Sequence, residues 1–523
     1  MAVAMGVNFS SIAILSFICF AIYWFYRVLD WVWLRPKKLE KCLREQGFRG
    51  NPYRPFLGDQ YESGKLIREA MSKPIGVEED VKKRIIPHIL KTVQTHGKNS
   101  FMWVGRIPRV HVTDPELIRE VLTKYYKFQK NHHDLDPITK LLLTGIGSLE
   151  GDPWSRRRKI INSAFQFEKL KLMLPAFYLS CRDMVSKWDN KVPEGGSAEL
   201  EVWHDIETLT GDVIARTLFG SNYEEGRRIF ELIKELTSLT IDVIRSVYIP
   251  GQRFLPTKRN NRMRAIDKEV RIRITEIINK KMKAMKAGEA TGDDFLGILL
   301  ECNLNEIKEQ GNNKNAGMSI EDIIGECKLF YFAGQDTTST LIVWAMILLS
   351  RFPQWQQRAR EEVSQVFGDR KPDYDGISRL KIITMILYEV LRIYSPVSEL
   401  TKVAHEDTQL GKYFIPAGVQ LMMPQMLLHH DPEIWGDDVM EFKPERFSEG
   451  VLKATKSQGS YFPFSLGPRM CIGQNFALLE AKMAMALILR RFSFELSPSY
   501  VHAPFTLITM QPQYGAHLIL HKL

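Results

Sequence analysis

The stretch Phe464-Ser-Leu-Gly-Pro-Arg-Met-Cys-Ile-Gly473 lies near the C-terminus and leads into an apolar-periodic run from Phe476 to Phe492. The periodicity of that run predicts a helix, so Cys471 is expected at a helix start. Backbone N–H groups and the positive end of the helix dipole would lower the pKa of the thiol there and favour the thiolate, the form that binds iron. The quoted stretch is therefore a candidate metal-ligating loop.

For a lone cysteine, the alternative interpretation is a buried thiol beside a helix. Here five positions match one pattern together: Phe464, Gly467, Arg469, Cys471 and Gly473. At the frequencies of these residues, a chance match somewhere in the chain is on the order of 10⁻⁴. The two glycines would let the backbone approach a flat ligand closely, because any Cβ there would collide with it.

A second motif, Ala333-Gly-Gln-Asp-Thr-Thr338, lies inside a long apolar segment from about Ile323 to Leu349 that reads as a helix. Glycine and β-branched threonine cost up to about 1 kcal/mol each in a helix interior relative to alanine, so something other than helix stability favours them. A local distortion over a ligand would explain the motif. The alternative is a regular helix in which each hydroxyl donates to the carbonyl four residues earlier.

Together the two motifs resemble the haem-binding loop and the oxygen-binding helix of the cytochrome P450 family. The resemblance implies haem b with Cys471 as the thiolate ligand to iron, a ligation that promotes O–O cleavage. It implies that Arg469 pairs with a haem propionate through charge-assisted hydrogen bonds. It makes Asp336 and Thr337 an acid–alcohol pair that relays protons to bound dioxygen, with Gly334 opening a groove over the ring. It assigns the remaining loop positions to cofactor binding: Phe464, Gly467 and Gly473.

Other positions match the same family pattern. Trp154 and Arg158 correspond to residues that contact the propionates from a helix on the other side of the ring. Lys402 stands where many relatives carry an arginine to a propionate, and a lysine would supply the charge without the bidentate fork.

A Glu-x-x-Arg pair also follows the order of the family. Glu389 and Arg392 share one helix face, a spacing worth only about 0.2–0.5 kcal/mol when exposed and frequent by chance. Their position before Pro444-Glu-Arg-Phe447 implies a buried ionic network with Arg446, which has a structural role.

The N-terminus predicts a membrane anchor. No charged side chain occurs from Ala2 to Tyr26, and Phe9 to Tyr26 is long and apolar enough to span a bilayer. A cleaved signal peptide is the weaker interpretation, because no basic residue precedes the apolar run and no clear small-residue cleavage site follows it. The basic flank that follows predicts a cytosolic body on a single-pass anchor. The family resemblance implies that this anchor lies in the endoplasmic reticulum membrane.

The expected domains are an anchor at residues 1–30, a basic, Pro- and Gly-containing hinge at 31–60 and one haem domain at 61–523. That domain exceeds the usual limit of about 250–300 residues for a single core. The resemblance to the cytochrome P450 family nevertheless implies one large domain. Helical periodicity dominates between residues 60 and 400, with short strand-like pieces such as Ser100–Val104 and Arg109–Val112. The expected class is mainly α with small β-sheets, the cytochrome P450 fold, preceded by one transmembrane helix.

Composition excludes several other classes of protein. The six cysteines have no CxxC pair, so they fit neither a disulfide framework nor a zinc site. A net charge of +10 would attract anionic surfaces, yet the chain carries no nucleic-acid motif, and no nucleic-acid partner is expected.

Within the family, the chain resembles the plant 72 group in Trp31-Val-Trp-Leu-Arg-Pro-Lys-Lys38 and in the run from Gly473 to Lys482. This implies hydroxylation of a plant monoterpenoid of iridoid biosynthesis, 7-deoxyloganic acid to loganic acid, with O₂ and with electrons from NADPH through NADPH–cytochrome P450 reductase. Membrane lipid is the other expected partner. Alternatives are a ring-opening oxidase of the secologanin or secologanic-acid type, or an oxidase of triterpenoids or other terpenoids.

Two alternatives come from different classes of protein. P450-fold isomerases and dehydratases work without a reductase, but they typically lack the acid–threonine pair that this chain retains. A non-catalytic haem- or steroid-binding protein would not consume NADPH to form a product.

Three segments are expected over the haem: the loop with His132 and His133, the Pro396–Thr401 turn and the Phe505–Thr509 turn. Either histidine could meet the carboxylate of the substrate, and Glu399 could accept from glucose hydroxyls. The structural alternatives are a surface histidine and a carboxylate at the edge of the core.

Overall fold

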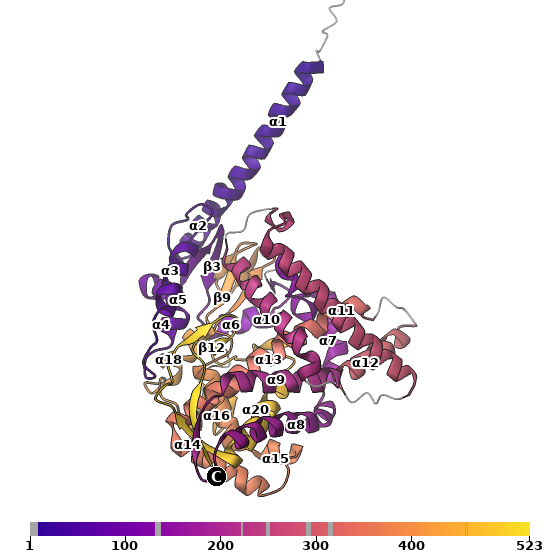
Figure 1. Ribbon diagram of the computed structural model, residues 1–523. Helices are drawn as coiled ribbons and strands as arrows, with labels where there is room; N and C mark the ends of the chain where they lie inside the picture. Colours follow the sequence, from indigo (N-terminus) through magenta and orange to yellow (C-terminus); the bar gives the residue numbers. More distant parts are fainter. Residues whose placement is uncertain are drawn as a thin grey trace, which may run out of the picture.

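The computed structural model describes residues 9–130, 137–220, 223–246, 251–288, 294–311, 317–455, 457 and 459–523. These residues form a mainly helical body with small β-sheets along one side, and helix α1 projects away from it (Figure 1). The predicted class, mainly α with small sheets behind one N-terminal apolar helix, is confirmed.

The α-helices, in chain order, are α1 (Phe9–Leu29), α2 (Arg35–Glu45), α3 (Gln60–Met71), α4 (Lys82–Ile85), α5 (Pro87–His96), α6 (Pro115–Thr123), α7 (Gly151–Ala164), α8 (Phe167–Lys191), α9 (Trp203–Phe219), α10 (Tyr223–Arg245), α11 (Lys258–Lys286), α12 (Phe295–Glu309), α13 (Ile320–Arg351), α14 (Pro353–Phe367), α15 (Tyr374–Arg379), α16 (Lys381–Ile393), α17 (Gln425–His429), α18 (Pro432–Trp435), α19 (Val451–Ala454) and α20 (Gln474–Arg491). The strands are β1 (Arg49–Gly50), β2 (Ser100–Val104), β3 (Ile107–His111), β4 (Phe128–Gln129), β5 (Ser197–Glu201), β6 (Leu400–Ala404), β7 (Thr408–Leu410), β8 (Tyr413–Ile415), β9 (Gln420–Met423), β10 (Phe492–Leu496), β11 (Pro504–Thr506), β12 (Met510–Pro512) and β13 (His517–Lys522).

The largest sheet joins distant parts of the chain in the order β1-β2-β3-β9-β6-β4. β3 pairs with β9 in parallel, so that Arg109 lies opposite Gln420, and β9 pairs with β6 in the antiparallel sense. Strand β2 has its predicted bounds, whereas β3 begins two residues before the predicted Arg109. The sheet therefore brings the segment after α16 next to the N-terminal hairpin.

Helix α13 is the central helix of the body. A capping box between Ser319 and Asp322 starts it, and the stretch from Leu341 to Leu349 is fully buried. Its length and composition would suit a membrane span, but its burial identifies it as a core helix. Between buried stretches, the six residues 332–337 are only half-buried. A half-buried patch in the middle of a core helix indicates a space inside the protein.

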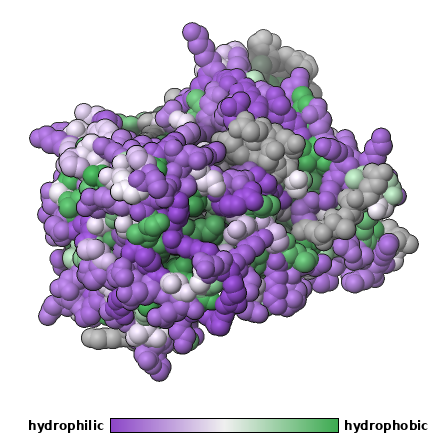
Figure 2. Space-filling view, turned by 60° about the horizontal axis from the view of Figure 1, so that its bottom comes forward, coloured by the Kyte–Doolittle hydropathy of each residue, from purple (hydrophilic) through white to green (hydrophobic). Residues whose placement is uncertain are grey.

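Helix α1 differs from the rest of the molecule because its large apolar side chains are exposed. The face of the body in Figure 2 is mainly hydrophilic, with hydrophobic residues in small groups. A continuous helical run of 34 residues, Ile12–Glu45, contains a candidate membrane span, and its most apolar part is not buried at all. The exposed apolar surface fits the predicted membrane anchor.

The region after the anchor packs on the body. A π-helical turn at Asp30–Leu34 connects α1 to α2 without a break. Leu43 and Phe48 belong to a buried cluster with residues of the large sheet, and the Tyr53 hydroxyl donates to the carbonyl of Val32 at 2.7 Å. The segment expected as a hinge thus contains a helix and core residues.

Candidate active site

The loop before α20 folds back on itself and presents Cys471. The N–H of Cys471 donates to the carbonyl of Phe464 at 2.8 Å, and the N–H of Ser465 donates to the carbonyl of Phe462 at 2.8 Å. Ser465 and Gly467 have φ of 65° and 71°, in the left-handed region. A non-glycine residue in that region costs free energy, and such strain clusters at functional sites.

The Cys471 thiol is reachable by water although protein encloses it. Burial raises its pKa above the ordinary value, and this outweighs the Gly473 N–H and the nearby Arg158, which both lower it. The predicted lowering of the pKa is therefore wrong for the protein alone, because desolvation exceeds the effect of the helix start. Coordination of the sulfur to a metal cation would oppose this shift and favour the thiolate.

Glycine is present at positions 467 and 473 of the loop for different structural reasons. At Gly467 an added Cβ would lie 2.9 Å from the carbonyl oxygen of Leu122 in α6, so both the turn and this close approach require glycine. At Gly473 an added Cβ would meet only the Cys471 Sγ, at 3.9 Å. The protein itself leaves open space beside the thiol, which fits the close approach of a flat ligand.

Arg469 lies beside this loop with unsatisfied donors. Its side chain is 4% exposed, and its Nη2 pairs with Glu150 and donates to the carbonyl of Leu149 at 2.8 Å. Its Nε and Nη1 are buried and have no hydrogen-bond partner in the described part of the chain. Unpaired donors on a buried guanidinium cost free energy, so this position favours a bound anion.

Lys130 and Lys402, which lie near Arg469, make the site still more cationic. Burial, then Lys402 and Arg469, lower the pKa of Lys130 to about 7. Burial and Arg469 lower the pKa of Lys402 to about 8, and Glu150 acts in the opposite direction on both. Within the described residues the cluster carries more basic than acidic groups, and an anionic partner would stabilise their charged forms. The two propionates of a haem would supply that charge, so the thiol, the open space beside it and the cations all fit a haem.

Helix α7 supplies Trp154 and Arg158. Arg158 donates through Nη2 to the carbonyl of Met470 at 3.0 Å, which ties α7 to the cysteine loop. The Trp154 ring lies 4.3 Å from the Arg469 guanidinium carbon and 5.0 Å from the Tyr125 ring. Trp154 thus orients Arg469 by a cation–π contact.

Asp336 is held by residues from the C-terminal part of the chain. Its carboxylate accepts a hydrogen bond from the Thr509 hydroxyl and another, of 2.6 Å, from the Gln511 side-chain amide. Burial raises the pKa of Asp336 to about 6, and the Thr509 hydrogen bond partly opposes this. An acid of this pKa can exchange protons near neutral pH.

Thr337 and Gly334 complete the half-buried patch of α13. The Thr337 hydroxyl donates to the carbonyl of Ala333 at 2.7 Å, the bond expected for a regular helix. A Cβ added at Gly334 would lie 2.3 Å from Cδ1 of Ile214 in α9. Close packing of α9 on α13 is therefore one reason for a glycine at position 334, and the groove over the ring stays a prediction.

The predicted ionic network is present beneath the loop region. Arg392 donates to both carboxylate oxygens of Glu389 at 2.8 Å, and both side chains are fully buried. Arg446 approaches the same carboxylate at 3.5 Å, and the N–H of Lys443 donates to it at 3.0 Å. Further bonds from Arg392 to the carbonyls of His429 and Glu441 fix α16 to the segment that precedes the cysteine loop.

The segments predicted to lie over the haem are only partly described. His132 and His133 lie outside the described residues. The other two segments lie close together, because the N–H of Met510, which follows Thr509, donates to the carbonyl of Pro396 at 3.0 Å. Sequence reasoning placed Thr509 in a segment over the haem but missed three other residues of the site, Lys130, Glu150 and Gln511, since none of them belongs to a local motif.

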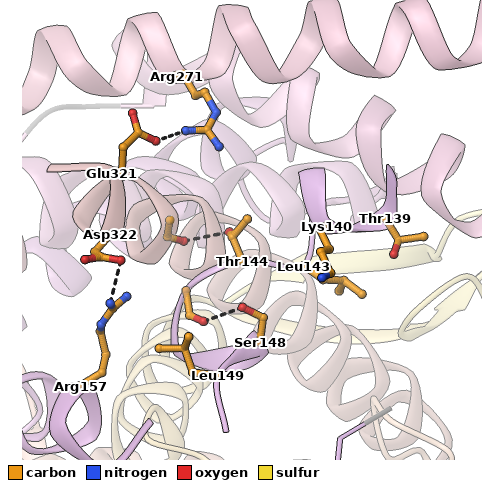
Figure 3. Close-up of a pocket in the computed structure, with 12 residues that line it drawn as sticks. Thr139, Lys140, Leu143, Thr144, Ser148, Leu149, Arg157, Arg271, Glu321 and Asp322 are labelled. Carbon is orange, nitrogen blue, oxygen red and sulfur yellow. Dashed lines mark hydrogen bonds and ion pairs between the residues drawn. The ribbon is translucent and has the colours of Figure 1, made fainter. Parts of the chain in front are cut away.

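A separate cavity of about 290 Å³ opens near the start of α13 (Figure 3). Two ion pairs border it, one between Arg271 and Glu321 and one of 2.7 Å between Arg157 and Asp322. Neither Cys471 nor Asp336 lines it. This cavity is therefore distinct from the candidate active site.

Comparisons with known proteins agree with this arrangement. The family model of cytochrome P450 matches residues 79–518. The chain is 87% identical over 521 residues to 7-deoxyloganic acid hydroxylase of Catharanthus roseus, covering 99% of this chain and 100% of that protein. It is 57% identical over 500 residues to secologanin synthase 1 of the same plant, covering 96% and 95%, and 52% identical over 520 residues to cytochrome P450 72A15 of Arabidopsis thaliana, covering 99% and 100%.

Proposed function

The chain belongs to the cytochrome P450 family and is a monooxygenase, and on that premise we propose that it hydroxylates 7-deoxyloganic acid to loganic acid. The observation that carries this proposal is the identity of 87% to 7-deoxyloganic acid hydroxylase along the whole chain. Identity to a secologanin synthase, the basis of the ring-opening alternative, is 57%.

The cofactor of this proposal is haem b, with Cys471 as the iron ligand. When bound, the haem supplies the activation of dioxygen, which thiolate ligation promotes. Arg469 has two free buried donors for a propionate, and Arg158, Lys130 and Lys402 add positive charge around it. The other predicted contacts are Trp154, which orients Arg469, and the loop residues Phe464, Gly467 and Gly473.

Asp336 and Thr337 would deliver protons. Asp336 has a pKa of about 6 and a fixed orientation, so it can take up a proton from water and pass it on. The Thr337 hydroxyl donates its hydrogen to the Ala333 carbonyl. The lone pairs of the hydroxyl oxygen therefore remain acceptors on the half-buried face of α13.

Replacing Thr337 by Ala tests this relay. The variant should keep the haem spectrum and still consume NADPH, but it should release hydrogen peroxide in place of part of the product. Thr340→Ala, which removes a similar hydroxyl bond three residues further on, is the matched control. Unchanged coupling between NADPH used and product formed in Thr337→Ala would refute the relay.

Electrons would come from NADPH through NADPH–cytochrome P450 reductase, and helix α1 would anchor the protein in lipid of the endoplasmic reticulum membrane. The exposed apolar surface of α1 and the basic residues after it support this placement, with the catalytic domain at residues 61–523 in the cytosol.

The decisive experiment expresses the chain with a plant reductase in yeast microsomes and supplies 7-deoxyloganic acid, loganic acid and a triterpene acid. We expect NADPH-dependent conversion of the first to loganic acid, and none with Cys471→Ser. Conversion of loganic acid to a ring-opened aldehyde would instead indicate secologanic-acid formation. Turnover of the triterpene alone, or product without NADPH, would overturn the proposed substrate or the proposed reaction.

A further inference from the structure

Three side chains from distant parts of the chain, Asp336, Thr509 and Gln511, form a closed set of hydrogen bonds, the Asp336 cluster. The Gln511 side-chain nitrogen donates to Asp336 Oδ1 at 2.6 Å and to Thr509 Oγ1 at 3.1 Å. The Thr509 hydroxyl donates to Oδ2 of Asp336. Each polar hydrogen of the two donor side chains is therefore directed at an acceptor within the cluster.

This arrangement suits the ionised form of Asp336. A carboxylate accepts hydrogen bonds at both oxygens, whereas a neutral acid must donate from one of them. The bonds from Thr509 and Gln511 therefore oppose the effect of burial on the pKa of Asp336. Glu207 of α9 raises this pKa and Lys234 of α10 lowers it, and their opposite charges, paired at 2.7 Å, partly offset each other. The Thr509 hydroxyl is the strongest of the groups that stabilise the charge.

The fold holds the two donors in place. Thr509 ends the turn between β11 and β12, and Gln511 lies two residues later in β12, so both side chains reach the same carboxylate. The carbonyl of Met510, between them, accepts a hydrogen bond of 2.6 Å from the Trp344 ring nitrogen of α13. Both donor side chains are buried. Strand β12 is thus bonded to α13 at a second point, which does not depend on Asp336, and the donors are preorganised.

We propose that Thr509 and Gln511 are positioning residues of proton delivery, which hold the Asp336 carboxylate in one orientation and stabilise the charge left after it has given up a proton. This inference rests on the proposed function, in which Asp336 passes on protons. In each transfer the acid loses its proton, the two donors stabilise the carboxylate, and a proton from water restores the acid. Without these donors, burial would keep the proton on Asp336 and its orientation would be free.

The first measurement follows the ionisation of Asp336 by thermal unfolding of the haem-loaded full-length protein across a range of pH. In the natural background, the effect of Asp336→Asn on the unfolding temperature should level off above about pH 6. In Thr509→Val the same effect should level off about one pH unit higher, because loss of a hydrogen bond to the carboxylate raises its pKa. Gln511→Leu should move it upward by less, and Thr509→Ser, which keeps the hydroxyl, should restore it.

The second measurement is the fraction of NADPH electrons released as hydrogen peroxide during turnover of 7-deoxyloganic acid. Thr509→Val and Gln511→Leu should raise this fraction by about twofold or more, because a misplaced acid that holds its proton delivers it poorly. Thr340→Val is the matched control, since it removes a hydrogen bond of 2.8 Å to the backbone carbonyl of Asp336 and leaves the carboxylate bonds intact. It should change neither measurement.

The reduced carbon-monoxide spectrum checks that each variant is folded and loaded with haem, and Thr509→Ala serves if Thr509→Val fails that check. More peroxide without a shift along the pH axis would make Thr509 and Gln511 structural residues and overturn the proposal. A shift without more peroxide would overturn it as well, because delivery would then not depend on the cluster.

Failure of the proposed function is distinguishable from failure of this inference. If Asp336→Asn itself leaves the peroxide fraction unchanged, the proposed role of Asp336 fails. If the natural protein does not convert 7-deoxyloganic acid, the proposed substrate fails. The unfolding measurement needs no substrate, so an unshifted pH dependence in Thr509→Val and Gln511→Leu would overturn the inference in either case.

Discussion

Cys471 and Cys327 are both enclosed by protein, but they differ in accessibility. Cys327 is buried within α13, whereas water reaches Cys471 beside open space at Gly473. A metal ligand needs that access, and a core thiol does not have it. The difference separates the proposed iron ligand from an ordinary buried cysteine.

Replacing Cys471 by Ser should therefore abolish the red-shifted Soret band of the reduced carbon-monoxide complex, because a hydroxyl does not replace the thiolate. The measurement is the difference spectrum of the purified full-length protein. Cys302→Ser, at a half-buried thiol of α12, is the control and should keep the band. A band that survives in Cys471→Ser would exclude this residue as the ligand.

Asp336 gives the protein a dependence of stability on pH. Its pKa rises from an ordinary 3.8 to about 6 on folding, so the folded state favours the neutral acid. The stability that this contributes, on the order of 3 kcal/mol, is present below about pH 4 and is lost as the pH rises through about 6. Asp336→Asn, which cannot ionise, should gain stability relative to the natural protein as the pH rises from about 4 to about 6, and the difference should level off above that. Thermal unfolding of both proteins across that range measures the difference, and a constant difference would contradict the raised pKa.

At the scale of helices, the packing of α9 on α13 limits the size of the side chain at position 334. The side chain of Gln335 donates to the carbonyl of Glu207, and Thr210 donates to the carbonyl of Gln335, so the two helices are bonded at this level. Any Cβ at Gly334 would press on Ile214 of α9. The glycine is thus coupled to one particular neighbour.

A double-mutant cycle tests this coupling. Gly334→Ala overpacks the interface and Ile214→Val removes the Cδ1 that it meets, so the double variant should be more stable than the sum of the single effects predicts. We expect a coupling of about 0.5–3 kcal/mol in the free energy of unfolding. If the glycine serves a groove over the ring instead, the two effects will simply add.

These elements also show how far the sequence could predict the site. The cysteine loop and the Glu389–Arg392 pair are local patterns; the structure shows the tight turn of the loop and the buried ion pair, and the cofactor contacts of the loop stay a prediction. Thr509 and Gln511 are more than 170 positions from Asp336 in the chain, and no spacing rule connects them. The raised pKa of Cys471 was missed for a related reason, because desolvation depends on everything that packs around the loop.

For the whole molecule, the anchor and the body are joined by helix and by packing. Deleting residues 2–29 removes the exposed apolar helix but no described core residue, so haem binding should persist while bulk membrane integration is lost. Deleting residues 2–45 also removes Leu43, which is fully buried, and should cost about 1.5–3 kcal/mol or more of stability. Microsomal fractionation, the carbon-monoxide spectrum and thermal unfolding distinguish the two. Loss of haem in the shorter deletion would place the domain boundary nearer the N-terminus.

The uninterrupted helical run from α1 through Asp30–Leu34 into α2 sets how the body is rotated about the axis of α1, as well as how far it lies from the membrane. An α-helix turns by about 100° per residue, so one residue inserted in this run would swing the body by about that angle around the axis of α1. The same insertion in a flexible linker would not restrict the orientation of the body relative to the membrane. The number of residues in this stretch, and not only their hydrophobicity, therefore sets which side of the body faces the bilayer.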